Sequence, residues 1–189
     1  AKKGKEMADL HIIKDGAVII KEGEIEAVGQ TGDIEKQFKK INAGHSDFDI
    51  IDARGKAVLP GFVDSHTHLV FGGYRAEEFS WRLRGDSYME IMKRGGGIVN
   101  TVTATRQASA EELMESGIRR LNSMLSFGVT TVEGKSGYGL DRETEIKQLE
   151  VMARLNQIHY LDVVPTFLGA HAVPQEYKGK PDAFIDFMA

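Results

Sequence analysis

The feature that most constrains the fold is a repeated order of apolar strand, polar or glycine-rich loop and long amphipathic helix after residue 56. This order is typical of βα units, in which crossover helices join parallel strands. Three units make about half of an eight-stranded barrel, which needs ~250 residues. We therefore expect an α/β chain that forms part of a (β/α)8 TIM-type barrel, or else a smaller open sheet. The expected strands are 57–64, 129–133 and 161–168, and the expected helices are 109–127, 141–157 and one beginning near 181.

Two of the expected helices have a definable inward face. The first begins with Ser109 and Glu112 in the spacing of a capping box and ends before Gly128, where a C-terminal cap belongs. Its apolar face is predicted to hold Leu113, Gly117, Ile118, Leu121 and Leu125. The inward face of the second is predicted to hold Ile146, Leu149, Met152 and Ala153.

The first 56 residues have a different pattern, with short β-like runs between Asp-Gly and Glu-Gly turns. They predict a small antiparallel meander of strands at 10–14, 17–21 and 24–28. One or two helical turns at 33–40, a loop at 42–47 and a strand at 48–52 are expected to follow. The pattern changes near Gly55, so residues 1–56 and 57–189 are predicted to be separate domains.

Composition excludes several classes of function. The formal net charge of −4 argues against nucleic acid or an anionic membrane as the main partner. Cysteine is absent, which excludes disulfide frameworks and thiolate metal sites. No apolar run is long enough for a signal sequence or a membrane span, so we expect a cytoplasmic protein. The chain begins without Met and stops within an amphipathic segment, which predicts a fragment of a longer protein.

The densest cluster of chemically active residues is the segment PGFVDSHTHLVFGG at 60–73. Residues two apart on an extended strand point to the same side, so Asp64, His66 and His68 would share one face. His66 and His68 are candidate ligands of one divalent metal ion, zinc or iron, and such an ion can supply hydroxide at neutral pH. The alternative is a pair of partly exposed histidines on a loop.

Polar residues also follow the other strands. Arg75, in a glycine-containing loop, is a candidate for binding a substrate carboxylate, and the alternative is a surface ion pair with Glu77 or Glu78. Tyr138 lies in the loop EGKSGYG at 133–139, where it could donate to a substrate oxygen or only pack over the glycines. His171 follows the third strand, so three units in a row deliver polar groups to the same rim.

The segments DSHTHLVFGGYRAEEF, RGGGIVNTV, KSGYGL and TFLGAHAVP, in this order, resemble the amidohydrolase superfamily and, within it, the imidazolonepropionase family. The resemblance implies a (β/α)8 barrel with a small β-sandwich, of which residues 1–56 would be a part. It further implies hydrolysis of the ring of 4-imidazolone-5-propanoate to N-formimidoyl-L-glutamate in histidine degradation. One bound zinc or iron ion and a homodimer are also implied.

Carried over by motif, His66 and His68 correspond to metal ligands of the family, and Arg75, Tyr138 and His171 to substrate-binding residues. Arg75 suits the propionate carboxylate, and His171 is the candidate catalytic residue, because it would polarise the ring carbonyl or the developing oxyanion. The family completes its metal site with a histidine and an aspartate from later strands, and takes its general base from a nearby glutamate. Those segments have no counterpart here, so we expect the N-terminal half of the enzyme, inactive by itself.

Two other functions are compatible with these residues. One is a related metal hydrolase with another substrate, such as a nucleobase deaminase, which would have no carboxylate for Arg75 to bind. The other is a small, non-catalytic α/β binding module in which the two histidines occupy a loop.

Overall fold

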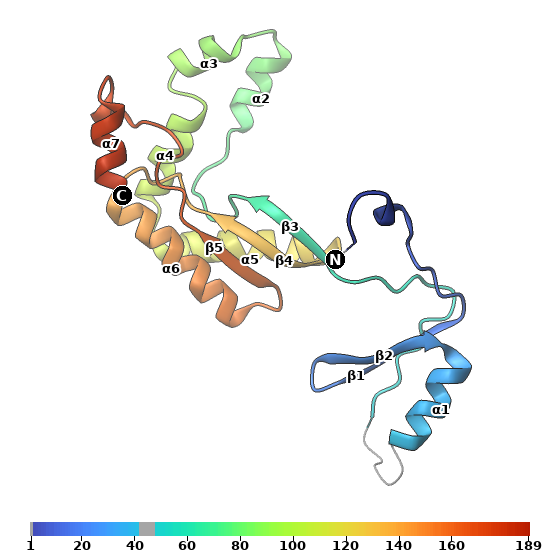
Figure 1. Cartoon of the computed structure of the whole chain (residues 1–189). Coiled ribbons are helices and arrows are strands. Elements are labelled where there is room, and N and C mark those ends of the chain that lie inside the picture. Colours follow the sequence, from blue (N-terminus) through green and yellow to red (C-terminus); the bar gives the residue numbers. More distant parts are fainter. Residues whose placement is uncertain (1, 42–47) are drawn as a thin grey trace. The chain divides into compact units, whose positions relative to one another are not determined.

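The computed structural model describes residues 2–41 and 48–189. The chain divides into two compact units, Ala1–Ala57 and Val58–Ala189 (Figure 1). Within the described residues, no helix combines the length and apolar character needed to cross a bilayer.

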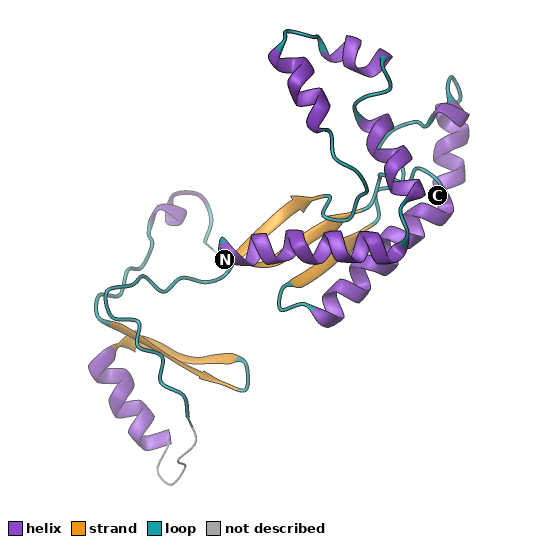
Figure 2. Cartoon of the chain, turned by 180° about the vertical axis from the view of Figure 1, so that it is seen from behind, coloured by secondary structure: helices purple, strands orange, loops and turns teal. Residues whose placement is uncertain are grey.

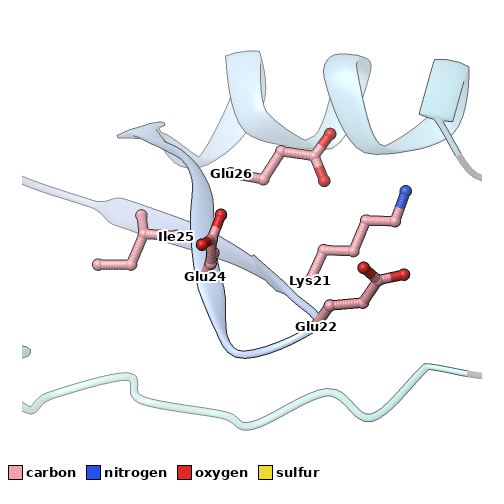
Figure 3. Close-up of a pocket in the computed structure, with 5 residues that line it drawn as sticks. All are labelled: Lys21, Glu22, Glu24, Ile25 and Glu26. Carbon is pink, nitrogen blue, oxygen red and sulfur yellow. The ribbon is translucent and has the colours of Figure 1, made fainter.

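The first unit is a two-stranded hairpin with one helix. After a short 3-10 helix, η1 (Gly4–Ala8), strands β1 (Gly16–Lys21) and β2 (Glu24–Gln30) pair antiparallel. Helix α1 (Thr31–Ile41) contacts both strands and buries Ile34 against them. The side chains of the β1–β2 turn surround an open hollow that contains none of the predicted site residues (Figure 3).

The three-stranded meander is wrong, because residues 10–14 form no strand. Leu10 and Ile12 are about three-quarters exposed there, so these two side chains bury little apolar surface against the hairpin. Residues 48–52 are also not a strand, and the expected loop at 42–47 lies outside the described residues.

The second unit is built on a parallel sheet, which confirms a mixed α/β fold. Strands β3 (Phe62–Thr67), β4 (Val129–Lys135) and β5 (Asp162–Thr166) lie side by side in that order. Helices α5 (Ala110–Ser126) and α6 (Arg142–Ile158) pack against each other and against the sheet (Figure 2). The core lies between these layers, and its fully buried members include Leu121, Val132, Met152, Leu155 and Leu161.

The described strands form an open sheet, so the (β/α)8 barrel and the β-sandwich remain predictions. On the sheet, Phe62 and Val164 keep about half of their surface exposed, whereas Val132 and Val163 are buried among the helices.

The connection from β3 to α5 contains three further helices, α2 (Ala76–Leu83), α3 (Tyr88–Lys93) and α4 (Ile98–Gln107). None of the three was predicted from the sequence. Helices α2 and α3 are short, and α4 is rich in β-branched residues, which disfavour helix. The chain ends with η2 (Gln175–Tyr177) and α7 (Pro181–Met188). Phe184 of α7, Val102 of α4 and Leu140 form a second, smaller core.

The predicted inward faces of the two long helices have different outcomes. In α5, Leu113, Gly117 and Leu121 are buried and the Ser109 capping box is present, as predicted, although Leu125 is partly exposed. In α6 the prediction is right for Met152, which is fully buried, and wrong for Ile146, which is 44% exposed, and for exposed Ala153. Leu149 is half-buried. The buried residues of α6 are Thr144, Glu145, Gln148, Val151, Met152 and Leu155.

Candidate active site

The loops after β3, β4 and β5 leave the sheet at the same edge, because the strands are parallel (Figure 1). This edge brings together three of the predicted residues. The ring centroids of His68 and His171 are 4.7 Å apart with nearly parallel planes, and the Tyr138 ring lies 4.6 Å from His68 and 5.4 Å from His171. The site therefore collects one aromatic side chain from each strand end.

His66 lies at the margin of this cluster. Its side chain is exposed, and its ring centroid is 6.3 Å from that of His68. Its backbone N–H donates to the Asp64 carboxylate at 3.3 Å. Within residues 2–41 and 48–189, no group of three His, Asp or Glu side chains is arranged to hold a metal ion. The two histidines are therefore an incomplete donor set.

His68 has the properties of a metal ligand. Its Nδ1 atom is buried and lacks a hydrogen-bond partner among the described residues. Burial lowers the pKa of His68, and the nearby His171 and His66 add to this effect when they carry charge. A neutral imidazole keeps a lone pair on one nitrogen, and this is the form that binds metals. The buried, unpaired nitrogen therefore fits a bound divalent ion.

The orientation of His171 is fixed by the loop after β4. Its Nδ1 lies 3.0 Å from the carbonyl oxygen of Gly137. Because a carbonyl oxygen only accepts hydrogen bonds, this contact places a proton on Nδ1. Nε2 is then the ring nitrogen that can act on a substrate.

The loop between β4 and α6, residues 136–141, is called the Tyr138 loop and has an unusual backbone conformation. Gly137 has a φ of 108° and Leu140 a φ of 52°, both in the left-handed half of conformational space. A side chain at Gly137 would meet the Cβ atom of His171 at 2.8 Å, so only glycine allows this approach. The prediction that glycines let the loop turn tightly therefore has a structural basis at this position.

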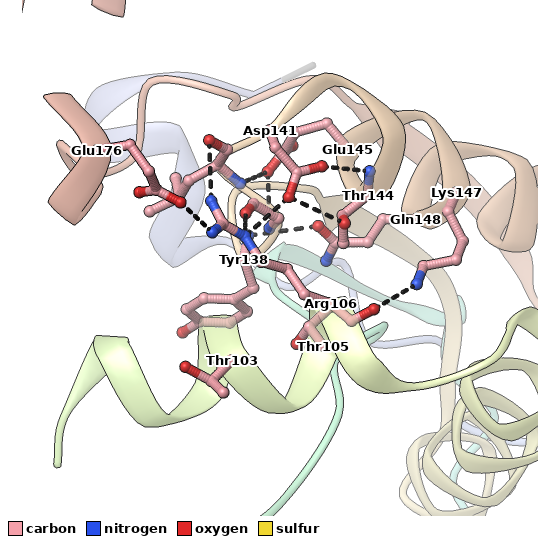
Figure 4. Close-up of polar contacts among 12 residues, drawn as sticks. Thr103, Thr105, Arg106, Tyr138, Asp141, Thr144, Glu145, Lys147, Gln148 and Glu176 are labelled. Atoms are coloured by element: carbon pink, nitrogen blue, oxygen red, sulfur yellow. Dashed lines mark hydrogen bonds and ion pairs between the residues drawn. The ribbon is translucent and has the colours of Figure 1, made fainter. Parts of the chain in front are cut away.

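A buried polar network beneath the loop was not predicted from the sequence (Figure 4). Glu145 and Gln148 of α6 bond to the loop backbone, and Arg106 of α4 donates to the carbonyl oxygens of Gly139 and Leu140. The sequence signal was the helical spacing that places Glu145 and Gln148 on one side of α6 with Met152. The prediction missed it because it chose the inward face from apolar residues alone.

Lys135, at the end of β4, forms an ion pair with Glu133 at 2.6 Å. The Thr166 hydroxyl donates to the same carboxylate oxygen at 2.8 Å. These two hydrogen bonds, the one from Lys135 being the stronger, lower the pKa of Glu133. Lys135 is one of the charged groups that act on His68, so the surroundings of His68 include an ammonium group held in an ion pair.

Arg75 precedes α2 and pairs with Glu78, with 3.8 Å between Nη1 and Oε2. The Glu78 side chain is buried and accepts a hydrogen bond from the backbone N–H of Gly97 at 2.9 Å. The structure thus pairs Arg75 with Glu78 rather than with the His68 cluster, while 45% of the Arg75 side chain remains exposed.

Comparison with known proteins gives a consistent relationship. A sequence profile of the amidohydrolase family matches residues 49–115. The chain is 58% identical to imidazolonepropionase of Clostridium tetani over 187 residues, which cover 99% of this chain and 43% of that protein. It is also 58% identical to imidazolonepropionase of Parabacteroides distasonis over 188 residues, and 54% identical to that of Phocaeicola vulgatus over 190 residues.

The alignment to the Parabacteroides and Phocaeicola proteins covers 44% of each, so the chain spans less than half the length of these relatives. The chain is thus similar over nearly its whole length to proteins named imidazolonepropionase, and the profile of the amidohydrolase family matches part of the same region.

Proposed function

We propose that the whole protein is an imidazolonepropionase, which hydrolyses the ring of 4-imidazolone-5-propanoate to N-formimidoyl-L-glutamate. The observation that carries this proposal is the convergence of His68, Tyr138 and His171 on one edge of a parallel sheet. Strand-end convergence is typical of active sites in α/β enzymes. The relatives, whose alignments cover 99–100% of this chain, are named imidazolonepropionase.

His66 and His68 would hold one divalent ion, zinc or iron. The buried Nδ1 atom of His68 without a partner supports this assignment, because a ligand would satisfy it. Bound there, the ion would supply hydroxide by lowering the pKa of a coordinated water. Two imidazoles are fewer than the three protein ligands of a typical catalytic site, so further ligands would come from outside the described residues.

The other residues would bind and polarise the substrate. His171, with its proton on Nδ1, presents Nε2 toward the ring carbonyl, and protonated Nε2 would stabilise the oxyanion that forms there. The Tyr138 ring lies beside that of His171, and its hydroxyl can donate a hydrogen bond to a substrate oxygen. Water adds across the amide, so the carbonyl carbon gains an oxygen, the carbon–nitrogen bond breaks and the nitrogen takes a proton.

Arg75 would bind the propionate carboxylate. Its contact with Glu78 is long for an ion pair, and the exposed part of the guanidinium can form a bidentate hydrogen bond with a substrate. The nucleobase deaminase alternative predicts no such contact, because its substrates are neutral.

The metal assignment is tested by metal content and ring hydrolysis of the whole protein. We expect about one zinc or iron ion per chain in the wild type. A double His66→Ala, His68→Ala variant should lose both the metal and the activity, whereas His11→Ala, an exposed histidine of the first unit, should keep both. A double variant that retains turnover would mean that catalysis uses another site. A wild-type protein with neither metal nor turnover would favour the non-catalytic binding module.

Substitution of Arg75 tests the substrate. Arg75→Met should raise KM for the anionic substrate at least about 30-fold, because loss of a charge pair with a carboxylate costs ~2 kcal/mol or more. Arg82→Met, an exposed arginine of α2, serves as the matched control. An unchanged KM in Arg75→Met would contradict the proposed carboxylate contact and favour a neutral substrate.

The resemblance also supports a homodimer that acts on a small molecule. We further propose a cytoplasmic location, and the net charge of −4 supports the absence of a nucleic-acid or membrane partner. Sedimentation equilibrium of the whole protein tests the oligomeric state, and a monomer at micromolar concentration would contradict the dimer.

A further inference from the structure

Glu145 is a carboxylate in the interior of the second unit, with only 1% of its surface exposed. Its oxygens accept hydrogen bonds from three backbone N–H groups of the Tyr138 loop (Figure 4). Oε1 accepts from Gly139 and from Leu140, each at 2.8 Å. The Gly137 N–H donates to Oε2 at 2.9 Å and, more weakly, to Oε1 at 3.2 Å. The carboxylate thus binds the backbone on both sides of Tyr138.

A carboxylate in the interior is unfavourable unless hydrogen bonds compensate for its lost hydration. Bonds from backbone N–H groups to an ionised carboxylate are stronger than bonds between neutral groups. They act here on a loop in which Gly137 and Leu140 have positive φ, a conformation that persists only when several contacts enforce it. Glu145 is therefore a main cause of the loop's shape.

Gly137 connects this carboxylate to the reacting end of the site. Its N–H donates to Glu145, and its carbonyl oxygen lies 3.0 Å from Nδ1 of His171. A shift of the Gly137 peptide would therefore alter the partner that orients the His171 ring. Tyr138, the next residue, would move with it.

A second contact holds the opposite side of the same backbone. Arg106 donates from Nε to the Gly139 carbonyl oxygen at 2.7 Å and also pairs with Asp141 at 2.8 Å. The loop is thus held through its carbonyl groups by α4 and through its N–H groups by α6. Only the contact with Glu145 reaches Gly137, the residue that bonds to His171.

We propose that Glu145 is a positioning residue, which sets the places of Tyr138 and His171 by holding Gly137. This inference rests on the proposed function, in which those two side chains act on the substrate. Glu145 itself is buried beneath the loop and acts only through it.

The sharpest perturbation is Glu145→Gln in the whole protein. The amide oxygen can replace Oε1 and keep the bonds from Gly139 and Leu140, but the amide NH2 then faces the Gly137 N–H, so a donor meets a donor. The substitution thus removes the shorter Gly137 contact, to Oε2, with almost no change in size, and leaves only the longer contact with Oε1 at 3.2 Å. Glu150→Gln, on the exposed side of the same helix, is the matched control.

Crystal structures provide a readout that does not depend on activity. In the Glu145→Gln variant we expect the Gly137 carbonyl oxygen and His171 Nδ1 to separate beyond hydrogen-bonding distance, while Glu150→Gln retains the wild-type contact. An unchanged contact in the Glu145→Gln variant would overturn the inference, whatever the activity.

Kinetics then test the route through His171. We expect Glu145→Gln to lower kcat/KM about 30-fold while the metal content is unchanged, and to have less than about a 3-fold effect in a His171→Asn background, because coupled residues are not additive. An equal loss in both backgrounds would mean general damage and would overturn the inference. If the wild type fails to hydrolyse 4-imidazolone-5-propanoate, the proposed function fails and the crystal structures alone decide the role of Glu145.

Discussion

Gln148 of α6 links two of the strand-end loops from a fully buried position. Its Nε2 donates to the Val70 carbonyl oxygen at 2.7 Å, and its Oε1 accepts from the Tyr138 N–H at 3.3 Å. Gln148→Met keeps the length and approximate volume of the side chain but removes both hydrogen bonds. We expect this change to destabilise the protein and to loosen the two loops from each other.

The magnitude follows from what is left unpaired. The Val70 carbonyl is buried, so loss of its donor costs about 1–3 kcal/mol, and the half-buried Tyr138 N–H adds about 0.5–1.5 kcal/mol. The free energy of unfolding should therefore fall by about 1.5–4.5 kcal/mol. Urea unfolding of the whole protein, monitored by circular dichroism, measures this difference. The dependence of the free energy of unfolding on urea concentration should be the same in both proteins.

Gln157→Met, at an exposed position near the end of the same helix, is the control for the change in side-chain chemistry. It should leave the urea midpoint almost unchanged. Equal midpoints for the two variants would refute the reasoning that the buried carbonyl depends on Gln148.

Three further predictions concern the second unit. The Arg120 guanidinium donates to two carbonyl oxygens after β3 and stacks on the Phe71 ring at 3.6 Å. Arg120→Lys should therefore lower the free energy of unfolding by about 1–3 kcal/mol. A lysine variant with the wild-type urea midpoint would contradict this. Burial lowers the pKa of His159, whose Nδ1 accepts from the Leu161 N–H at 3.1 Å. The free energy of unfolding should therefore decline as pH falls below the unfolded-state pKa of about 6.5. His159→Gln should flatten this decline, measured between pH 7.5 and 5.5. Ser109→Ala removes the capping box of α5 and should cost about 0.5–2 kcal/mol, visible as a lower thermal midpoint.

The parts of the fold that the sequence predicted are those specified by short-range patterns. Helix α5 has an apolar stripe, a serine cap and Gly128 at its end with a φ of 84°, and each of these features is visible within about twenty residues. The three parallel strands follow from the alternation of apolar runs and helices, although the first was predicted at 57–64 and lies at Phe62–Thr67. The meeting of His68, Tyr138 and His171 follows from that order, because parallel strands end at one edge.

Contacts between distant residues could not be predicted in the same way. The partner of Gln148 is a carbonyl oxygen 78 residues away, and no local pattern identifies a buried backbone group that needs a donor. The Gly137 carbonyl that orients His171 is equally invisible in a sequence. The pair of Arg75 with Glu78, by contrast, is local and was one of the two alternatives that the sequence offered.

The error in α6 follows from the same cause. A rule that places apolar residues inward puts Ile146 in the core, yet Ile146 is 44% exposed and its neighbour Glu145 is buried. The inward surface of the first turns of α6 faces a loop whose backbone N–H groups have no partner within a helix or strand. Polar side chains that accept from these groups are therefore favoured there, and apolar ones are not. Farther along the helix the neighbours are apolar, and Val151, Met152 and Leu155 obey the ordinary rule. A helix that supports an active-site loop at one end and a core along the rest is therefore expected to change its inward chemistry along its length. Polar residues on the apolar stripe mark the end nearest the site.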